Sequence, residues 1–355
     1  MEKSDEIIII GGGLSGLLLA FLLRKSGKRT IILEASSRFG GRIQTMTGLH
    51  GTPMELGATW FSAMHPHLIS LVEEMGLERF PQLSEGVSLF QPKSFEPPQT
   101  FYTPATDAPS FRLKGGTQQL IYALKNKLDD ASLYLDQPVK MITQAGDDIL
   151  VMTDQGMTLR GAAVVICVPP QLAADQIIFD PMLPADVAEV MNSSHTWMAG
   201  SIKFALEYAT PFWRNKGYSG MLYSHAGIVM EMYDHTNMEG SKFGFTGFLN
   251  GGTVQFKPEI RKEYVLRQLI GLFGPDAERP TTYFDKVWND KYIISGNPVI
   301  SQPHQNNGHS LLLESYMNSK LYFGATETSP VNGGYMEGAV RAAKRVANRL
   351  IRELV

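Results

Sequence analysis

The chain has 355 residues, of which 43% are hydrophobic and 19% charged, the composition of a globular protein with a large core. A formal net charge of −3 gives no basic surface for nucleic acid or for an anionic membrane, so neither is expected as a partner. The single cysteine, Cys167, excludes an intrachain disulfide and a zinc site built from several cysteines, and it favours a reducing, cytoplasmic location.

The N-terminal segment lacks the features of a targeting sequence. Residues 1–6 are acidic and lead directly into an apolar run, without the basic region of a signal peptide. The apolar stretch at residues 17–23 is far shorter than the roughly 20 residues that a membrane-spanning helix needs. We therefore expect a soluble protein.

The first 34 residues predict a strand, a helix and a second strand. Residues 7–10 are four isoleucines, a β-branched run that suits a strand buried on both faces of a parallel sheet. Residues 14–26 have apolar residues at helical spacing and end at Gly27, and residues 30–33 form a second strand-like run. This order is that of a βαβ unit.

A glycine triplet, Gly11-x-Gly13-x-x-Gly16, occupies the turn between the first strand and the helix, and Glu34 ends the second strand. The glycines permit a tight turn, a close approach of the backbone to a pyrophosphate, and close packing of helix on strand. Glu34 is placed to accept the ribose hydroxyls of an adenosine. The pattern predicts a dinucleotide site, but by itself it does not choose between NAD and FAD.

A second glycine pair follows shortly after Glu34. Gly40 and Gly41 allow another close backbone approach, and the guanidinium of Arg42 is able to bind phosphate oxygens through paired hydrogen bonds. A surface turn with a solvated arginine is the alternative.

Later segments predict more strands and a second layer. Strands are expected at residues 149–152 and 164–168, the latter stopped by two prolines. Residues 81–111 contain six prolines, so we expect an irregular excursion with little helix. The aromatic-rich block 197–288 contains strand-like pieces such as residues 201–206 and is expected to form a separate, substrate-side layer.

Five segments together resemble the flavin-dependent amine oxidase family, the monoamine and polyamine oxidases. They occur in the family's order and cover most of the chain. The segments are IIIIGGGLSGLLLAFLLRKSGKRTIILEASSRFGGRIQT at residues 7–45, ELGATWF at 55–61, VVICVPP at 164–170, GSIKFALEYATPFWR at 200–214, and GATETSPVNGGYMEGA at 324–339, which follows a strand-like triplet at 321–323.

The resemblance implies an α/β fold with two discontinuous domains. A Rossmann-type FAD-binding domain, with a parallel sheet and helices, would contain residues 1–75, 112–192 and 290–355. An α+β substrate-binding domain with a mixed or antiparallel sheet would contain residues 76–111 and 193–289.

The resemblance also implies the residues of the cofactor site. In that family the terminal strand and helix fold back onto the flavin, so Gly333 and Gly334 would let the start of the last helix approach the flavin ring, and Glu327 would belong to the cofactor-binding turn. The implied FAD-binding residues are Gly11, Gly13, Leu14, Ser15, Gly16, Glu34, Ala35, Gly40, Gly41, Arg42, Gly57, Ala58, Thr59, Trp60, Val139, Gly324, Glu327, Gly334, Tyr335 and Met336.

Two residues match the family's catalytic positions. Lys203, in an apolar strand, matches the lysine that holds a water beside flavin N5; the alternative is an edge-strand lysine that reaches solvent. Tyr335 matches the aromatic residue that faces the substrate; the alternative is simple helix packing. Phe61, Tyr233 and Trp288 are further candidates for the substrate pocket.

The sequence departs from the family around Asn297 and Pro298, where it has neither the flavin-linking cysteine nor the second cage tyrosine. We therefore expect noncovalent FAD and only half of the usual aromatic cage. Cys167 lies in a different strand and is expected to be a small buried hydrophobic residue. Candidates to complete the cage are Tyr233, Phe245, Trp288 and Tyr292.

A second departure is the shortness of residues 81–111, which occupy the place of the helical segment that roofs the substrate cavity in the family. We expect an open site, with room for a bulky amine, or a site covered by a second subunit of a homodimer.

The reaction implied by the resemblance is removal of a hydride from the carbon next to an amine nitrogen to flavin N5, followed by imine hydrolysis and reoxidation of the flavin by O2 to H2O2. Two alternatives stay open: a flavin desaturase or dehydrogenase acting on a C–C bond, and a flavin-binding protein whose active site has decayed. No metal is expected. The histidines, which suit surface turns better than metal ligation, are His65, His67, His304 and His309.

Overall fold

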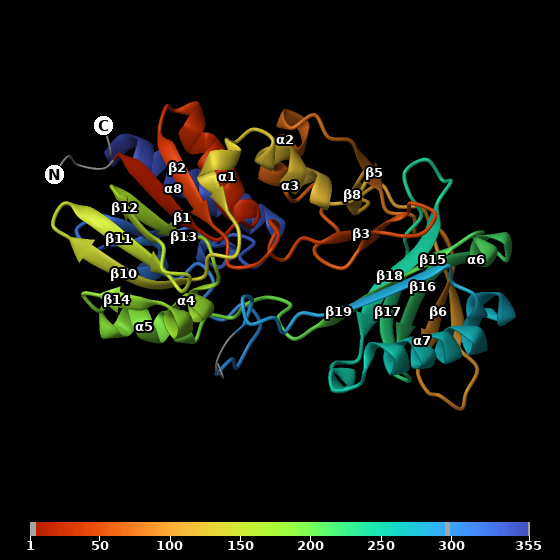
Figure 1. Cartoon of the computed structure of the whole chain (residues 1–355). Coiled ribbons are helices and arrows are strands. Elements are labelled where there is room, and N and C mark those ends of the chain that lie inside the picture. Colours follow the sequence, from red (N-terminus) through yellow and green to blue (C-terminus); the bar gives the residue numbers. More distant parts are fainter. Residues whose placement is uncertain (1–4, 295–298, 354–355) are drawn as a thin grey trace.

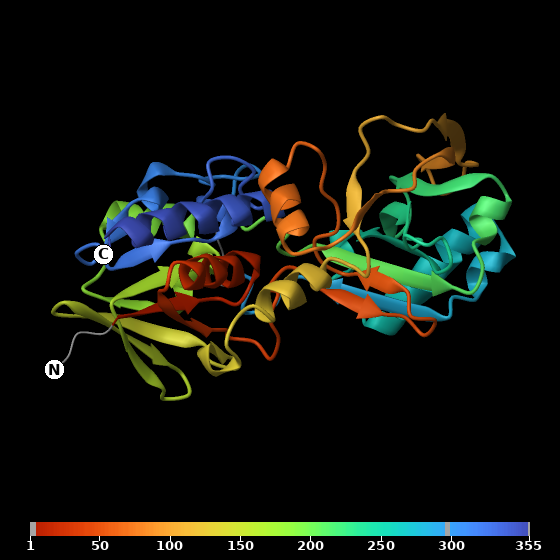
Figure 2. The same cartoon turned by 90° about the horizontal axis from the view of Figure 1, so that it is seen from above.

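The structure consists of two lobes that lie side by side, each built on its own large sheet (Figure 1). The computed structural model describes residues 5–294 and 299–353, so Asn297 and Pro298 lie outside the described residues. Seen from above, helices α2 (Pro66–Glu74) and α3 (Gln118–Lys125) lie between the two large sheets (Figure 2).

The first lobe contains a six-stranded sheet in the order β20-β21-β13-β1-β2-β9. Its neighbouring strands run parallel, except that β20 is antiparallel to β21. The isoleucines of β1 are buried on both faces, because Ile7 and Ile9 pack in one core and Ile8 and Ile10 in another. The strands are β1 (Glu6–Ile10), β2 (Arg29–Leu33), β9 (Leu133–Tyr134), β13 (Ala163–Ile166), β20 (Ser315–Tyr316) and β21 (Leu321–Phe323).

Helices cover one face of this sheet, and a smaller sheet covers the other (Figure 1). On the face of Ile7 lie the helices α1 (Leu14–Lys25) and α8 (Met336–Glu353). On the face of Ile8 lies a four-stranded sheet in the order β12-β11-β10-β14. The elements of this second layer are β10 (Val139–Ala145), β11 (Asp148–Thr153), β12 (Thr158–Gly161), β14 (Ile178–Asp180), α4 (Pro170–Gln176) and α5 (Ala185–Asn192).

The predicted βαβ unit is confirmed by β1, α1 and β2. The strands expected at residues 149–152 and 321–323 are β11 and β21, and the strand expected at 164–168 ends at Ile166. The α/β fold class is confirmed.

The second lobe contains a seven-stranded sheet in the order β19-β15-β18-β17-β16-β6-β7. Helix α7 (Pro258–Phe273) lies along one face, where its Val265 and Leu269 share a core with Phe204 and Leu206 of β15 (Figure 1). The aromatic-rich block thus forms a separate layer, as predicted. Its elements are β15 (Ile202–Tyr208), α6 (Phe212–Asn215), β16 (Tyr218–Ser224), β17 (Val229–Asp234), β18 (Phe243–Leu249) and β19 (Thr282–Val287).

The expectation of an irregular excursion at residues 81–111 is wrong, although the segment has no helix. Its prolines lie at strand ends and in loops, and the intervening residues form regular strands: residues 86–91 and 99–103 extend the second lobe's sheet, whereas residues 79–81 and 111–113 pair with each other in a separate two-stranded sheet. Because a proline disrupts pairing only where its missing N–H is needed, proline-bounded runs remain free to pair. The strands are β5 (Arg79–Pro81), β6 (Gly86–Gln91), β7 (Gln99–Thr103) and β8 (Phe111–Leu113).

A hairpin after the second glycine pair connects the lobes. Strands β3 (Thr45–Thr47) and β4 (Pro53–Glu55) pair antiparallel, and Met54 and Leu56 pack against Ala205 of β15. The chain that leaves the glycine turns is thereby fixed to the second sheet. The short 3-10 helices are η1 (Asp130–Ser132), η2 (Gly251–Thr253), η3 (Pro275–Glu278), η4 (Ser310–Leu313) and η5 (Thr326–Thr328).

Candidate active site

The glycine triplet forms the turn from β1 into α1. Gly11 has a φ of +105°, which disfavours other residues, and a Cβ on Gly16 would lie 2.0 Å from the carbonyl oxygen of Gly11. Gly13 is the N-cap of α1. The space beside its Cα is open, because a Cβ placed there would have Gly41 Cα, at 3.9 Å, as its nearest neighbour. The turn therefore presents bare backbone beside the start of a helix, as anion binding requires.

The second glycine pair lies directly against the first turn. The Gly40 amide donates to the Gly12 carbonyl at 2.9 Å, and Gly13 and Gly40 form an isolated parallel bridge. Arg38 holds this turn in place, since its guanidinium donates to the carbonyls of Gly41 at 2.6 Å and Ile43 at 2.9 Å. Two glycine turns from separate parts of the sequence thus form one backbone cradle.

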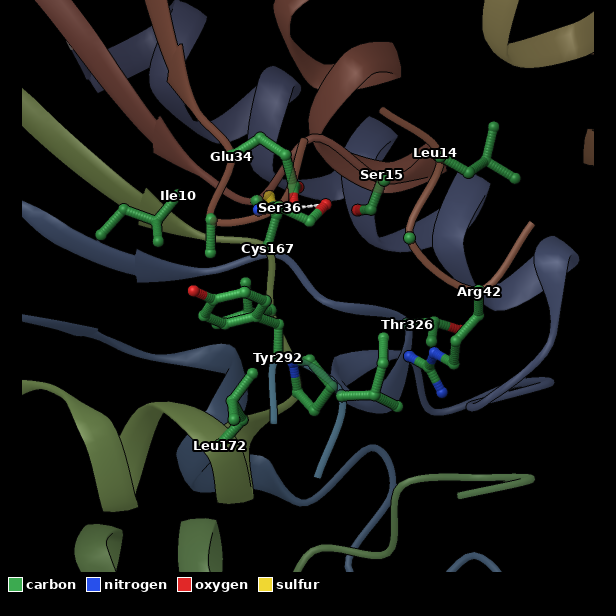
Figure 3. A pocket seen from close by; sticks show the side chains of 18 of the residues that line it. Ile10, Leu14, Ser15, Glu34, Ser36, Arg42, Cys167, Leu172, Tyr292 and Thr326 are labelled. Carbon is green, nitrogen blue, oxygen red and sulfur yellow. Dashed lines mark hydrogen bonds between the residues drawn. The ribbon is translucent and has the colours of Figure 1, made fainter. Parts of the chain in front are cut away.

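Glu34 lies at the end of β2, and its side chain points toward the same cradle (Figure 3). One carboxylate oxygen accepts from the Gly12 amide at 2.7 Å, and the other accepts from the amide and hydroxyl of Ser36 at 2.9 and 2.7 Å. The residue is 8% exposed and lines the cavity, so its orientation is fixed by these three hydrogen bonds.

These turns form one wall of a long cavity, which also contacts α4 and the segment around Trp288 and Tyr292 (Figure 3). The structure brings most of the predicted cofactor residues together on this cavity. Those that line it are Gly11, Gly13, Leu14, Ser15, Glu34, Ala35, Gly40, Gly41, Arg42, Ala58, Val139, Gly334, Tyr335 and Met336.

Arg42 and Glu327 form an ion pair at the cavity, with Nη1 and Oε1 2.7 Å apart. Glu327 comes from η5, directly after β21, and is fully buried. Its carboxylate accepts no hydrogen bond from the part of the chain that the structure describes, so the ion pair with Arg42 is its main polar contact there. Gly324, three residues before Glu327 in the sequence, does not line the cavity; a Cβ at this position would lie 3.0 Å from Cγ1 of Val165. The buried carboxylate of Glu327 therefore fixes the orientation of the Arg42 guanidinium.

The turn before α8 closes the cavity at its other end. Gly334 has a φ of +88° and donates its amide to Thr326 Oγ1 at 3.1 Å, and that hydroxyl donates to the Tyr335 carbonyl at 2.7 Å. Tyr335 lines the cavity and is 41% exposed, so the alternative of simple helix packing does not describe its side chain.

Lys203 lies on β15, between β18 and β19, and not at a sheet edge as one alternative supposed. Its ammonium group donates to the Gly57 carbonyl at 2.7 Å and to the Thr59 hydroxyl, and it lies 4.8 Å from the ring centroid of Trp60. The side chain is only 2% exposed. Burial lowers the pKa of Lys203 to about 7, although the carboxylates of Glu55 and Glu231 oppose this effect.

Three aromatic candidates for the substrate pocket lie in different places. Trp288 lines the cavity, with its indole N–H donating to the Leu56 carbonyl at 2.7 Å. Tyr233 lies edge-on to Trp60 at 5.1 Å, and its hydroxyl is 2.8 Å from that of Tyr223. Phe61, in contrast, is buried in the first lobe's core and does not line this cavity.

Three other residues also carried sequence-based expectations. Phe245 is fully buried, with its ring centroid 4.0 Å from that of Trp213, and does not complete the aromatic cage. Cys167 is a partly buried residue that packs against the first lobe's core and also lines the cavity, and burial of its thiol raises its pKa to about 12. His304 lies in a turn, as expected, where its partly buried ring stacks on that of Trp197.

Charged residues that the sequence did not single out also line the cavity. Arg38 lies next to the second glycine pair, and this position in the sequence could have identified it as a cavity residue. Lys286 and Asp290 flank Trp288, and burial lowers the pKa of Lys286 to about 8. Leu172 of α4 is an apolar residue whose sequence position carries no signal.

The described residues contain neither a candidate metal site nor a helix that could cross a membrane. In residues 5–294 and 299–353, histidine, cysteine and carboxylate side chains nowhere gather in groups of three that would hold a metal ion. Over the same ranges, every helix is too short or too polar to span a bilayer.

Comparisons with known proteins agree with this geometry. The model of the family described as flavin containing amine oxidoreductase matches residues 14–103 and 95–351. The chain is 24% identical to a Dictyostelium discoideum protein named "Probable flavin-containing monoamine oxidase A", over 99% of this chain and 98% of that one. It is also 24% identical to the putrescine oxidase of Kocuria rosea, over 82% and 83% of the two chains.

Solved structures show the same fold. Wild-type putrescine oxidase bound to putrescine superposes with a TM-score of 0.85 at 22% identity, covering 99% of both chains. Cyclohexylamine oxidase from Brevibacterium oxydans IH-35A also gives a TM-score of 0.85 at 22% identity. Since the family model matches most of the residues, the chain belongs to the flavin-containing amine oxidoreductase family.

Proposed function

We propose that this protein oxidises the C–N bond of an amine with noncovalent FAD and O2. The observation that carries the proposal is the single cavity that joins Glu34, the two glycine turns, Arg42 and Tyr335. When bound, FAD accepts a hydride at N5 from the carbon next to the amine nitrogen and passes the electrons to O2, which yields H2O2 and an imine that hydrolyses.

The residues of the cavity fit a flavin dinucleotide along its length. Glu34 offers a fixed carboxylate for ribose hydroxyls, and the open backbone at Gly13 and Gly41 offers room for a pyrophosphate that Arg42 would neutralise. We place the isoalloxazine end at the turn before α8, where the start of a helix favours negative charge.

Noncovalent attachment is supported by the state of the cysteine. Cys167 is the one cysteine of the chain, and the pKa of its thiol is raised to about 12 by burial. A thiol of this kind is a weak nucleophile at neutral pH, because the thiolate is the reactive form.

We assign Lys203 the role of holding a water molecule at the reacting edge of the flavin. Two of its N–H groups are used on Gly57 and Thr59, and a charged amine has one more to donate. With a pKa near 7, the amine is also able to release or take up a proton at physiological pH.

The proposed substrate is an amine that enters as an ammonium ion. The half-exposed ring of Tyr335 offers a face that attracts a cation, and Trp60 and Tyr233 extend the aromatic surface on the side of Lys203. The substrate must then lose a proton, which an apolar surrounding favours. Putrescine and cyclohexylamine, after which the similar proteins are named, are the first compounds to test as substrates.

We also propose a division into two domains, which the separate large sheets of the two lobes support: residues 1–75, 112–192 and 290–355 for FAD, and 76–111 and 193–289 for the substrate. The alignment to the Dictyostelium protein spans 454 positions against 355 residues here, so this chain lacks segments that the relative has, and we propose that the cover over the substrate side is one of them. A homodimer partner or a bulky substrate would then cover the site. We further propose a cytoplasmic location, on the basis of the single cysteine.

The test is anaerobic mixing of the FAD-loaded protein with a panel of amines, followed by admission of air. We expect bleaching of the flavin absorbance by at least one amine and release of about one equivalent of H2O2 when air is admitted. Bleaching without peroxide would instead indicate a dehydrogenase with another acceptor, and a flavin that stays oxidised with every amine would contradict the proposal.

A further inference from the structure

Lys286, a cation that the sequence did not single out, lines the cavity from the side of the second lobe. It lies on β19, the edge strand of the seven-stranded sheet, where a lysine commonly points to solvent and prevents pairing with another sheet. Here the ammonium group lies 4.0 Å from the ring centroid of Trp288 and donates to Oε1 of Gln44 at 2.8 Å. These two contacts hold the charge at the cavity.

The charge of Lys286 is not neutralised by a carboxylate. Within residues 5–294 and 299–353 it forms no ion pair, and the group that accepts its hydrogen bond is the neutral amide of Gln44. The arginines of the cavity differ in this respect or in their bonding. Arg42 is paired with Glu327 at 2.7 Å, and Arg38 donates to the carbonyls of the second glycine turn. Lys286 therefore offers the cavity a positive charge whose N–H groups are only partly used.

Two charged neighbours act on Lys286 from the same cavity. Burial lowers the pKa of Lys286 to about 8, Arg38 adds to this effect, and Asp290 opposes it. The carboxylate of Asp290 accepts from the Tyr292 amide at 2.9 Å, so it is oriented by its own turn. At pH 7, one unit below its pKa, the amine of Lys286 is mostly in the charged form.

The position of Lys286 relative to Lys203 places it near the reacting end of the cofactor. The two are cross-strand partners on β19 and β15, and the Cβ atoms of such partners are about 5 Å apart. Lys203 turns toward Gly57 and Thr59 and does not line the cavity, whereas Lys286 does. Of this pair, Lys286 is therefore the lysine that borders the space for the cofactor.

We propose that Lys286 faces the isoalloxazine ring of bound FAD and stabilises the negative charge that the ring gains on reduction. A hydride leaves the neutral amine as a cationic imine and brings two electrons and one proton to the ring, which thereby gains one negative charge. A fixed ammonium group in a partly buried site favours this anionic form over the neutral oxidised ring. The inference rests on the proposed amine oxidation and adds a residue that raises the reduction potential of the cofactor.

The experiment measures the midpoint potential of the FAD-loaded protein at pH 7.0, by slow reduction with xanthine and xanthine oxidase beside a reference dye. Lys286→Met keeps the length of the side chain and removes its charge. We expect it to lower the midpoint potential by about 30 mV, which for a two-electron couple is a 10-fold loss of preference for the reduced cofactor. Lys286→Arg keeps a charge that is able to stack on Trp288, so its potential should stay close to that of the wild type.

Two further variants guard the interpretation. Lys286→Gln, which is neutral and still able to bond to Gln44, should lower the potential as Lys286→Met does, and it replaces that variant if methionine is not tolerated. Lys262→Met removes an exposed lysine from α7 and is the matched control for loss of one positive charge. Its potential should not change.

The affinity of the apoprotein for oxidised FAD, measured by fluorescence quenching, identifies the part of the cofactor that Lys286 contacts. We expect less than about a 3-fold loss in Lys286→Met, because the oxidised ring is neutral. A loss of 10-fold or more with an unchanged midpoint potential would place the ammonium group at the phosphates and overturn the inference. An unchanged potential in both neutral variants would overturn it as well, and so would an equal shift in Lys286→Arg.

The outcome is separable from that of the proposed function, because the potential is measured without an amine. If no amine bleaches the flavin, the proposed reaction is contradicted, whatever the potentials are. If amines bleach it and the neutral variants keep the wild-type potential, the reaction stands and the role of Lys286 is contradicted.

Discussion

Lys203 and Lys286 lie directly opposite each other on the antiparallel strands β15 and β19, so their side chains leave the same face of the sheet. Each ammonium group lies over a tryptophan ring: Lys203 is 4.8 Å from the centroid of Trp60, and Lys286 is 4.0 Å from that of Trp288. Burial lowers the pKa of both, to about 7 and about 8. The two residues therefore form a natural pair for substitution.

Replacement of Lys203 by Met is expected to slow reoxidation of the reduced flavin by roughly 10- to 100-fold, because the variant has no N–H to hold a water and no amine to exchange a proton. Stopped-flow mixing of anaerobically reduced protein with oxygenated buffer measures this step. Lys286→Met should slow it less, since Lys286 is only partly buried and donates to the Gln44 side chain at 2.8 Å. Equal effects of the two changes would contradict the assignment.

Lys203→Met should also change how stability depends on pH. The pKa of Lys203 is near 7 in the folded protein and near 10.5 in the unfolded chain, so the unfolded state binds the additional proton between these values. Its burial therefore destabilises the fold fully below pH 7, and this penalty disappears as pH rises toward 10.5. We expect Lys203→Met to raise the free energy of unfolding, measured in urea, by about 1–3 kcal/mol at pH 6.5. This gain should disappear by pH 9.5. A gain that does not change with pH would argue against the depressed pKa.

Glu34→Ala should weaken FAD binding by roughly 10- to 100-fold, because two hydrogen bonds between ribose hydroxyls and a charged acceptor would be lost. Quenching of FAD fluorescence during titration with apoprotein measures the affinity. Ser36→Ala, which removes one hydroxyl that donates to Glu34 at 2.7 Å and leaves the carboxylate in place, is expected to have a much smaller effect. An unchanged affinity in Glu34→Ala would place the adenosine elsewhere.

Gly334→Ala and Gly27→Ala separate backbone strain from steric conflict. Both glycines have positive φ, +88° and +75°, so each change should lower the free energy of unfolding by about 1 kcal/mol. A Cβ at Gly27 has no neighbour within 4 Å, whereas one at Gly334 would lie 2.7 Å from Trp197 Cβ. Gly334→Ala alone should therefore raise KM for amines, measured by peroxide release. A raised KM in Gly27→Ala would show that the effect is general destabilisation.

The cofactor half of the site was predictable because its signal is local. Four β-branched residues, a glycine triplet and an acid at the end of the next strand lie within 34 residues, and each acts on the backbone near its own position. The positions of Gly11, Gly13 and Glu34 on one cavity follow directly from this pattern.

The substrate half was less predictable because its contacts join distant segments. Trp197, His304 and Tyr335 meet only in the folded chain, and a histidine in a polar loop gives no sign of its ring partners. Phe61 follows Trp60 directly, yet the two side chains point to different environments: one enters the core beside Phe111, and the other lies under Lys203. Composition alone does not decide such directions.

The hydrogen bond from Lys203 to the Gly57 carbonyl links the two lobes at the residue that we propose to act in the reaction. The same chain segment continues from the glycine cradle, and its Met54 and Leu56 are packed on the second sheet. A hinge motion that separated the lobes would have to break this buried bond and expose that apolar contact. We therefore expect substrate and oxygen to reach the site through movements of side chains at its rim, with the bond between Lys203 and Gly57 kept intact.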